Sequence, residues 1–342
     1  MNERGMTLIE LLVGMAVGLV VLGLVSKTFI SVIRPQSQQK KIAEANIDKA
    51  IGLEVLRKDI EMAGFGLPWD LNGHAYTEAA SDSSYTPDPQ NFNDVGNPPK
   101  AFSFSDNANP TNPSSDVLVI RSSAACMTDP VTQRWGYVVS GGSYQSLSPD
   151  STASGYFGIM DTDKKLIQYT STSFPDPGAG NVYFAFGLSS GTPRMPFNRV
   201  DYHLESKGVP ARCCSGTYEL YRSEIDQGTG SRDDQPILDC VKDFQVAFGL
   251  DTDGDGLVDS WASSVPSSAS SVRNQVKQVR VFAAYQEGQF DRGYTHNAGT
   301  ITLGDNNTGN LSSFILQGDE VHYRWKVLRL VVNPINLIPQ QR

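Results

Sequence analysis

An acidic stretch from residue 251 to 259 holds the clearest ligand pattern in the chain. It reads Asp-Thr-Asp-Gly-Asp-Gly-Leu-Val-Asp, with carboxylates at positions one, three, five and nine. This is the spacing of a calcium loop, where alternate carboxylates converge on one hard cation and a glycine at position six allows a sharp turn. We therefore expect bound Ca²⁺. Its ligands would be the carboxylates of Asp251, Asp253, Asp255 and Asp259 and the backbone carbonyl of Leu257.

The loop departs from a full EF-hand at position twelve. Ala262 stands where a bidentate glutamate would be, so water or another carboxylate must complete the shell. The alternative is a solvated acidic hairpin turn, because Asp-Gly is also a favoured turn pair. A second polar run, residues 305–309, is more typical of a simple turn.

Patterns that would indicate an enzyme are weak. Residues 187–191 match G-x-S-x-G, but a nucleophile elbow needs a following helix, which Pro193 and Pro196 oppose. The four histidines form no H-x-x-x-H pair, and no GxxxxGK[ST] motif is present. We therefore predict that the chain is not an enzyme; a membrane-anchored enzyme is the disfavoured alternative.

The charge pattern argues against one class of partner. The formal net charge is -9, and the chain contains no run rich in Lys and Arg. Because affinity for phosphate comes from clustered basic side chains, we expect no nucleic-acid binding.

The four cysteines predict disulfides. They are Cys126, Cys213, Cys214 and Cys240, and an even number in an exported domain favours bridges. A bond between the adjacent Cys213 and Cys214 would close a strained small ring. We favour separate bonds from these two residues to Cys126 and Cys240, with the pairing left open; buried free thiols are the alternative.

The N-terminal segment predicts a membrane helix. Residues 6–25 are apolar apart from Thr7 and Glu10, which is about the length that spans a hydrocarbon core of roughly 30 Å. Arg4 precedes the segment and favours a cytoplasmic N-terminus with the remainder exported. A carboxylate inside an apolar helix is costly in lipid, so Glu10 indicates a functional partner.

Residues 5–13, Gly-Met-Thr-Leu-Ile-Glu-Leu-Leu-Val, resemble the class III signal of type IV prepilins and type II secretion pseudopilins. The resemblance implies that a prepilin peptidase cuts after Gly5 and that Met6 becomes the methylated mature N-terminus. It also implies that Glu10, the fifth mature residue, guides assembly. Pairing between this carboxylate and the freed amine of a neighbouring subunit would satisfy both charges. Met6 departs from the phenylalanine that is usual at this position.

Beyond the membrane segment, residues 36–63 continue a helical pattern, and Pro35 should kink or briefly interrupt it. Two apolar stripes follow, one with Ile51 and one with Leu56 and Ile60; they could contact the head and filament neighbours, or form one wide buried face.

Residues 70–115 are rich in Pro, Asn, Asp and Ser and predict a long surface loop. Strands are predicted at residues 117–121, 136–139, 166–170, 182–186, 200–204, 218–222, 241–250, 276–285 and 323–332.

Several head segments resemble the PilW family of type IV pilus minor pilins. The segments are residues 56–66, 115–121, 241–251 and 276–281. The resemblance implies an α+β, pilin-like fold in which a long N-terminal transmembrane helix packs on a β-rich globular head with long loops. Residues 1–5 would be the leader, 6–63 the helix with its transmembrane part at 6–26, and 64–342 the exported head.

The same resemblance implies a minor pilin, a structural subunit that helps to initiate pilus assembly or to cap the tip. Its partners would be other minor pilins, the major pilin and the prepilin peptidase. The precursor would sit in the inner membrane as a single-pass protein with its head in the periplasm, and the mature subunit in the pilus at the cell surface. The alternatives are a minor pseudopilin of type II secretion and a calcium-dependent adhesin at a pilus tip.

Overall fold

The computed structural model describes residues 8–337 apart from 97, 108, 110, 113, 149–153 and 172. Within the first helix, the side chains of residues 10, 28 and 30–48 also lie outside the described part. The chain divides into two units, residues 1–48 and 49–342, which are treated separately below.

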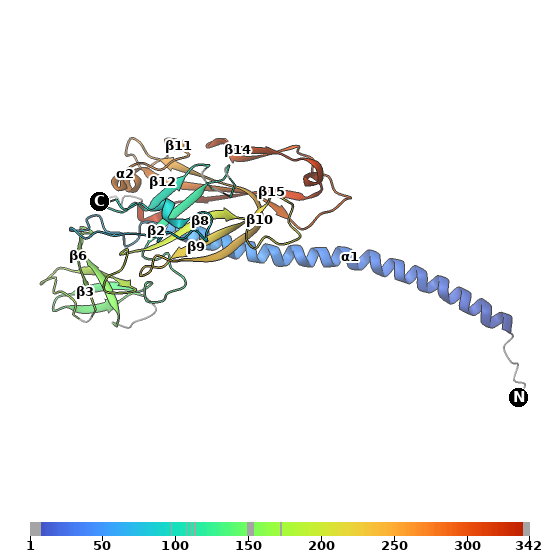
Figure 1. Ribbon diagram of the computed structural model, residues 1–342, viewed down its shortest axis with the longest axis horizontal. Helices are drawn as coiled ribbons and strands as arrows, with labels where there is room; N and C mark the ends of the chain where they lie inside the picture. Colours follow the sequence, from blue (N-terminus) through green and yellow to red (C-terminus); the bar gives the residue numbers. More distant parts are fainter. Residues whose placement is uncertain are drawn as a thin grey trace, which may run out of the picture. The chain divides into compact units, whose positions relative to one another are not determined.

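Helix α1 begins at Leu8 and ends at Glu61, so its larger part forms the first unit (Figure 1). The expected interruption at Pro35 is not seen, because the helix is continuous through this residue. A proline removes a single backbone N–H, and the turns on either side keep their own hydrogen bonds. Within the part of the chain that the structure describes, no helix combines the length and apolarity needed to cross a membrane.

The second unit is built around a large antiparallel sheet with strand order β1-β2-β8-β9-β10-β12-β15, to which β11 adds by pairing with β10. A smaller sheet has the order β4-β3-β7-β5-β6, and β13 and β14 form a hairpin. The strands of the large sheet are β1 (Phe102–Ser105), β2 (Val117–Ser122), β8 (Asn198–Glu205), β9 (Tyr218–Ile225), β10 (Arg232–Leu250), β11 (Ser260–Ala262), β12 (Val276–Glu287) and β15 (Arg324–Val332).

The remaining elements lie between these strands in the sequence. The small sheet and the hairpin comprise β3 (Trp135–Val139), β4 (Ser143–Ser146), β5 (Tyr156–Met160), β6 (Leu166–Thr170), β7 (Tyr183–Leu188), β13 (Thr300–Asp305) and β14 (Gly309–Ile315). A short helix α2 (Ala269–Gln275) and the 3-10 turns η1 (Pro89–Phe92), η2 (Gly318–His322) and η3 (Ile335–Leu337) complete the unit. Each predicted strand coincides with an observed one. The prediction missed β1, β4, β5, β11, β13 and β14, most of which are short or polar and so carry weak alternation.

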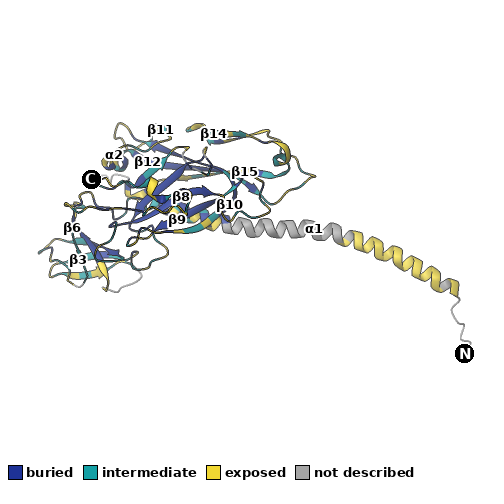
Figure 2. Cartoon of the chain, viewed as in Figure 1, coloured by how far each residue is buried: buried dark blue, intermediate teal, exposed yellow. Residues whose placement is uncertain are grey.

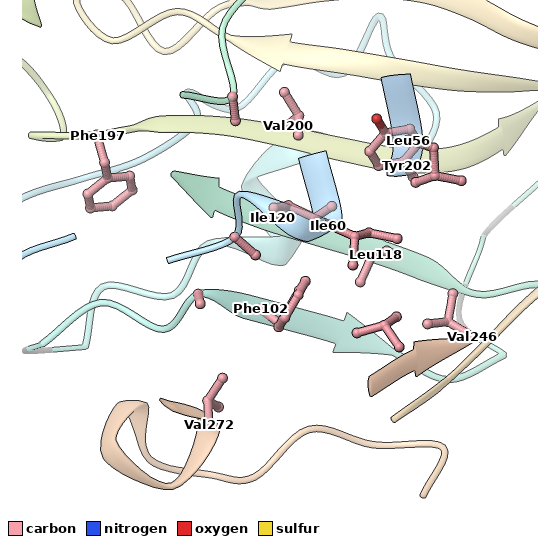
Figure 3. Packing of buried hydrophobic residues seen from close by; sticks show 14 of the residues in the cluster. Leu56, Ile60, Phe102, Leu118, Ile120, Phe197, Val200, Tyr202, Val246 and Val272 are labelled. Atoms are coloured by element: carbon pink, nitrogen blue, oxygen red, sulfur yellow. The ribbon is translucent and has the colours of Figure 1, made fainter. Parts of the chain in front are cut away.

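The end of α1 packs on the large sheet and forms the main core. Leu56 and Ile60 are fully buried among residues of β2, β8 and β10, including Leu118, Val200 and Val246 (Figure 3). Ile51 on the other predicted stripe is 61% exposed. The two stripes therefore differ: one is the head-facing side of the helix and the other is free for a second contact.

Gly52 allows the helix to approach the sheet closely. A Cβ atom at this position would collide with the backbone carbonyl of Ile237 in β10. Nearby, the Lys49 ammonium lies 4.3 Å from the centre of the Tyr285 ring in β12. Burial lowers the pKa of Lys49 from 10.5 to about 8, and Glu287 offsets part of that effect.

The expectation of a surface loop at residues 70–115 is wrong in part. The segment is mostly irregular, as expected, but it contributes Tyr76, Glu78 and Ala79 to the interior and contains strand β1. Its backbone lacks regular partners, so side chains and scattered bonds such as Thr77 N–H to the Arg194 carbonyl hold it in place. The segment is therefore a covering layer over the sheet.

The hairpin β13–β14 covers another part of the large sheet. Ile301 and Leu303 of the hairpin share a buried apolar cluster with Phe282 of β12 and Trp325 of β15. Gln245 pairs with Phe282 in register, so it lies on this face of the sheet as well. Figure 2 shows the strands of the sheet as the most buried part of the second unit.

Candidate functional site

The acidic loop connects two paired strands of the large sheet. Strand β10 ends at Leu250, β11 begins at Ser260, and the register places these residues opposite each other. One antiparallel ladder therefore holds both ends of residues 251–259. Gly254 and Gly256 have φ angles of 86° and 88°, in the left-handed region that favours glycine.

Three of the predicted calcium ligands converge in this loop. One carboxylate oxygen from each of Asp251, Asp253 and Asp259 lies within 4.8 Å of the others. Asp255 is not in this group; its carboxylate accepts a hydrogen bond from the Leu257 backbone N–H at 2.7 Å. Oxygen ligands of this kind and charge suit a hard cation such as Ca²⁺.

Asp251 is the most firmly held of the three. It is buried, and its two oxygens accept backbone N–H bonds from Gly254 at 2.6 Å and Gly256 at 2.9 Å. The Lys277 ammonium lies 3.6 Å from one of these oxygens. Burial acts to raise the pKa of Asp251, but the two amides and the ammonium outweigh it, and the pKa is lowered. The group is therefore ionised at neutral pH.

Asp259 closes the loop from its other end. Its Oδ2 accepts the Thr252 backbone N–H at 2.7 Å and the Thr252 hydroxyl at 3.0 Å. These bonds lower the pKa of Asp259. Asp251 and Asp259 are thus both negative at neutral pH, and Lys277 is the one cation paired with the loop among the described residues. The arrangement leaves net negative charge available to a cation.

The predicted processing and assembly residues lie wholly or partly outside the residues that the structure describes. Gly5 and Met6 lie outside the described residues, and Glu10 lies in α1 with its side chain also outside them. The described residues between 8 and 29 are exposed in the single chain (Figure 2), with Leu8 at 83% and Leu19 at 70%. An apolar helix surface of this kind needs lipid or other helices to cover it.

The cysteine prediction is partly correct. Cys213 and Cys240 form a disulfide, which is one of the pairings that the sequence analysis left open. Cys126 and Cys214 are free thiols, so the second expected bond is absent from the described structure. Cys126 lies beside Glu224 of β9 at 3.6 Å, whereas Cys214 belongs to the apolar cluster under the hairpin. The two thiols therefore occupy separate environments.

Sequence reasoning missed the buried ion pairs that fix the helix end and the covering segment. Asp59 of α1 accepts hydrogen bonds at 2.7 Å from both Arg222 of β9 and the Tyr202 hydroxyl of β8. Burial raises the pKa of Asp59, and the Arg222 guanidinium offsets part of the increase. Arg222 also pairs with Glu224. This pairing joins α1 to the middle of the sheet through charged groups inside the core.

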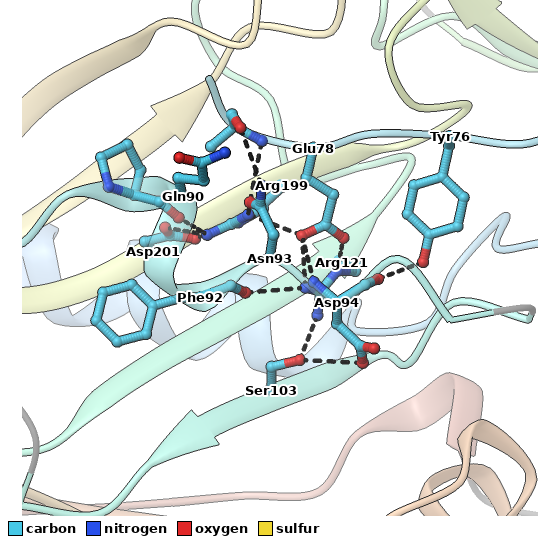
Figure 4. A network of polar contacts seen from close by, with 12 residues as sticks. Tyr76, Glu78, Gln90, Phe92, Asn93, Asp94, Ser103, Arg121, Arg199 and Asp201 are labelled. Carbon is cyan, nitrogen blue, oxygen red and sulfur yellow. Dashed lines mark hydrogen bonds and ion pairs between the residues drawn. The ribbon is translucent and has the colours of Figure 1, made fainter. Parts of the chain in front are cut away.

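A second buried network lies on the opposite face of the sheet (Figure 4). Glu78 of the covering segment pairs with Arg121 of β2 and, at 2.7 Å, with Arg199 of β8, and all three side chains are fully buried. Arg199 also binds Asp201 at 2.7 Å. The charges therefore have permanent partners and are suited to holding the segment in place. Polar residues alternate with apolar ones at positions 199, 201, 203 and 205, and this pattern was the signal available for the network. The same pattern is typical of a strand with one solvent-exposed face.

Comparisons with known proteins match both ends of the chain. Residues 1–26 match the prokaryotic N-terminal methylation motif, and residues 209–336 match the model of the type IV pilus-assembly protein W, or PilW, family. The second match contains the acidic loop, the disulfide partner Cys240 and strands β12 and β15. Together, the two matches support a PilW-type minor pilin.

Among solved structures, the chain is similar to a type IV-like pilin from Thermus thermophilus. The identity is 11%, the match covers 86% of this chain and 97% of the other, and the TM-score is 0.37. No protein of curated function matches it in sequence.

The structure explains two weak sequence patterns, the G-x-S-x-G match and one of the histidines. Strand β7 ends at Leu188, and bends rather than a helix follow Ser189 in the described residues. His203 is buried and lies 2.8 Å from the Arg232 guanidinium, so it belongs to a core network.

Proposed function

We propose that this minor pilin initiates assembly of a type IV pilus or caps its tip, together with other minor pilins and the major pilin. The observation that carries the proposal is the uncovered apolar surface of α1 after a prepilin motif. In this proposal, lipid of the inner membrane covers this surface in the precursor, and the head lies in the periplasm. The crossing segment would include residues 6 and 7, which lie outside the described part of the chain in which no membrane-spanning helix is found. In the filament, neighbouring helices replace the lipid.

Glu10 directs that exchange in the proposed mechanism. A prepilin peptidase removes residues 1–5, Met6 becomes the methylated N-terminus, and its amine pairs with Glu10 of a neighbouring subunit. A charged carboxylate is costly in lipid unless it is paired, so the pairing favours assembly over the free membrane state. The enzyme acts on the chain; the chain itself has a structural role.

Mass spectrometry of the protein purified from membranes and from sheared pili tests the processing step. We expect loss of residues 1–5 and one added methyl group on Met6. An intact leader on the wild-type protein would contradict the proposal. In a strain that lacks the gene, wild type should restore pili while Glu10→Gln should not. Asp161→Asn, a change in the head far along the chain, is the matched control and should restore them; equal piliation by all three would also contradict it.

We also propose that the acidic loop binds Ca²⁺. The convergence of Asp251, Asp253 and Asp259 and the left-handed glycines support this. Asp255, which stands at position five of the pattern, and the Leu257 carbonyl are further ligands if the loop tightens on the ion. Water completes the shell in this proposal, because Ala262 has no ligand group.

Thermal unfolding of the full chain in detergent micelles, with Ca²⁺ or chelator, tests the site. A ligand at a hundredfold excess over its Kd stabilises the native state by about 2.7 kcal/mol. The shift should disappear in Asp253→Asn and remain in Asp163→Asn, which changes an exposed aspartate in the turn between β5 and β6. No shift in wild type, or the same shift in both variants, would remove the site.

A further inference from the structure

A polar pocket of about 270 Å³ lies on the outer face of the large sheet, apart from the acidic loop and from α1. Four separate parts of the chain contribute to it: the turn after β1, strand β10, the end of β11 and the turn of the β13–β14 hairpin. Its lining residues are Asp106, Asn107, Gln245, Ala247, Trp261, Ala262, Ser263, Thr308, Asn310 and Leu311.

Gln245 is the most informative residue of the pocket. It is only 2% exposed, and its amide nitrogen donates to the Ser114 carbonyl at 2.6 Å and to Asp243 at 3.0 Å. Because both partners are acceptors, the orientation of the amide is defined. Its oxygen accepts no hydrogen bond from any other described residue, and the residue lines the pocket. This oxygen is therefore open to a donor from a ligand or from water in the pocket.

The rest of the lining provides complementary groups. The Asn310 amide and the Ser263 hydroxyl bond to none of the other described side chains or backbone groups, so both can turn to a ligand. Amides and hydroxyls each offer donors and acceptors, which is the pattern that matches the hydroxyl groups of a polyol. Trp261 adds a large apolar surface.

The charges near the pocket disfavour an anionic ligand. Asp106 is the one charged residue of the lining, and no Lys or Arg is in it. Arg280 stacks over the Trp261 ring, 4.0 Å from its centre, but its guanidinium is bound at 2.7 Å and 2.9 Å by Asp305. The stacking holds the indole in place while Asp305 neutralises the cation. A neutral ligand rich in hydroxyl groups fits this combination.

We propose that this pocket binds one sugar residue of a saccharide. The Gln245 oxygen and Asp106 accept from sugar hydroxyls, Asn310 and Ser263 donate to them, and the C–H groups of the sugar contact the part of the Trp261 side chain that lines the pocket. At about 270 Å³, the pocket is large enough for one pyranose ring. The site shares no residue with α1 or with residues 251–259, although β11 both lines the pocket and holds one end of the acidic loop.

Saturation-transfer NMR on the full chain tests the proposal, with methyl glycosides of glucose, galactose, mannose and N-acetylglucosamine as probes. The micelles must be of a detergent without a sugar headgroup. A small ligand in an open site gives a Kd on the order of 1 mM. At least one glycoside should saturate the protein and bind more tightly than glycerol. Binding of glycerol as tight as that of every glycoside, or no saturation up to about 50 mM, would overturn the proposal.

Matched variants locate the binding. Asn310→Ala and Trp261→Phe should each weaken binding of the best glycoside about tenfold, the loss of one good contact. Asn297→Ala and Trp69→Phe change an exposed asparagine and an exposed tryptophan outside the pocket and should leave it unchanged. Thermal unfolding of each variant checks that it is folded. Equal affinity in all four folded variants would place the sugar elsewhere and reject this pocket.

Discussion

The buried network around Glu78 and the acidic loop around Asp251 use carboxylates in opposite ways. Glu78 has no exposed surface and is paired with two arginines that are also fully buried. The loop keeps Asp253 and Asp259 exposed, and Lys277 is its one paired cation in the described structure. A carboxylate with permanent arginine partners holds the fold together, whereas carboxylates that converge without such partners remain available to a cation from solution.

The largest expected effect comes from Glu78→Gln. The change leaves Arg121 and Arg199 buried without their shared carboxylate, and breaking such a pair costs about 3–5 kcal/mol of unfolding free energy. Urea unfolding of the full chain in micelles, followed by tryptophan fluorescence, measures the loss. Glu54→Gln is the matched control, because Glu54 pairs with Arg57 at the surface with 61% of its side chain exposed. Equal losses in the two variants would remove the distinction between buried and exposed carboxylates.

Asp116 provides an intermediate case, because it is buried and pairs with no arginine among the described residues. Burial raises its pKa from 3.8 to about 7, while the backbone amides of Asn107 and Val246 offset part of the effect. The folded state therefore binds the proton more tightly than the unfolded state does. This contribution to stability is fully present below about pH 3.8 and is lost as the pH rises through about 7.

Asp116→Asn, which mimics the protonated carboxyl, should therefore reduce the loss of stability between about pH 4 and pH 7. Unfolding free energies across this pH range measure the slope. Part of the slope should remain, because burial also raises the pKa of Glu219 from 4.5 to about 7. If wild type and variant have parallel pH profiles, Asp116 is ionised in the folded protein and resembles Glu78 more than we infer.

The smallest expected effect concerns Lys277 beside the acidic loop. Lys277→Met removes the ammonium that lies 3.6 Å from Asp251 and that repels an incoming cation. Calcium affinity, measured by titration at low ionic strength, should increase a few-fold. Lys165→Met is the control, because its ammonium pairs with Asp70 at 3.8 Å outside the loop. An unchanged or weaker affinity in Lys277→Met would mean that the ammonium supports the loop rather than competing at it.

Local patterns in the sequence determined much of the architecture. Alternation and β-branched residues located most strands of the large sheet, and the 3.6-residue period identified the Leu56 and Ile60 face that the structure buries. The spacing of Asp251, Asp253 and Asp259 located a group that converges in space. The prepilin-like segment and the PilW-like head motifs indicated the family. Each of these patterns is formed by residues close together in the sequence, so it can be recognised without the tertiary structure.

Tertiary structure alone decided which charges are buried and which cysteines pair. Glu78 meets Arg199 across 121 positions, and the pattern of β8 is the same whether its charged face meets solvent or a covering segment. Cys213 rather than Cys214 bonds Cys240, because the irregular segment between β8 and β9 decides which of the two adjacent side chains meets β10. The polar pocket joins four segments and has no pattern of its own. Burial is a property of what packs on a residue, and the partner is usually distant in the sequence.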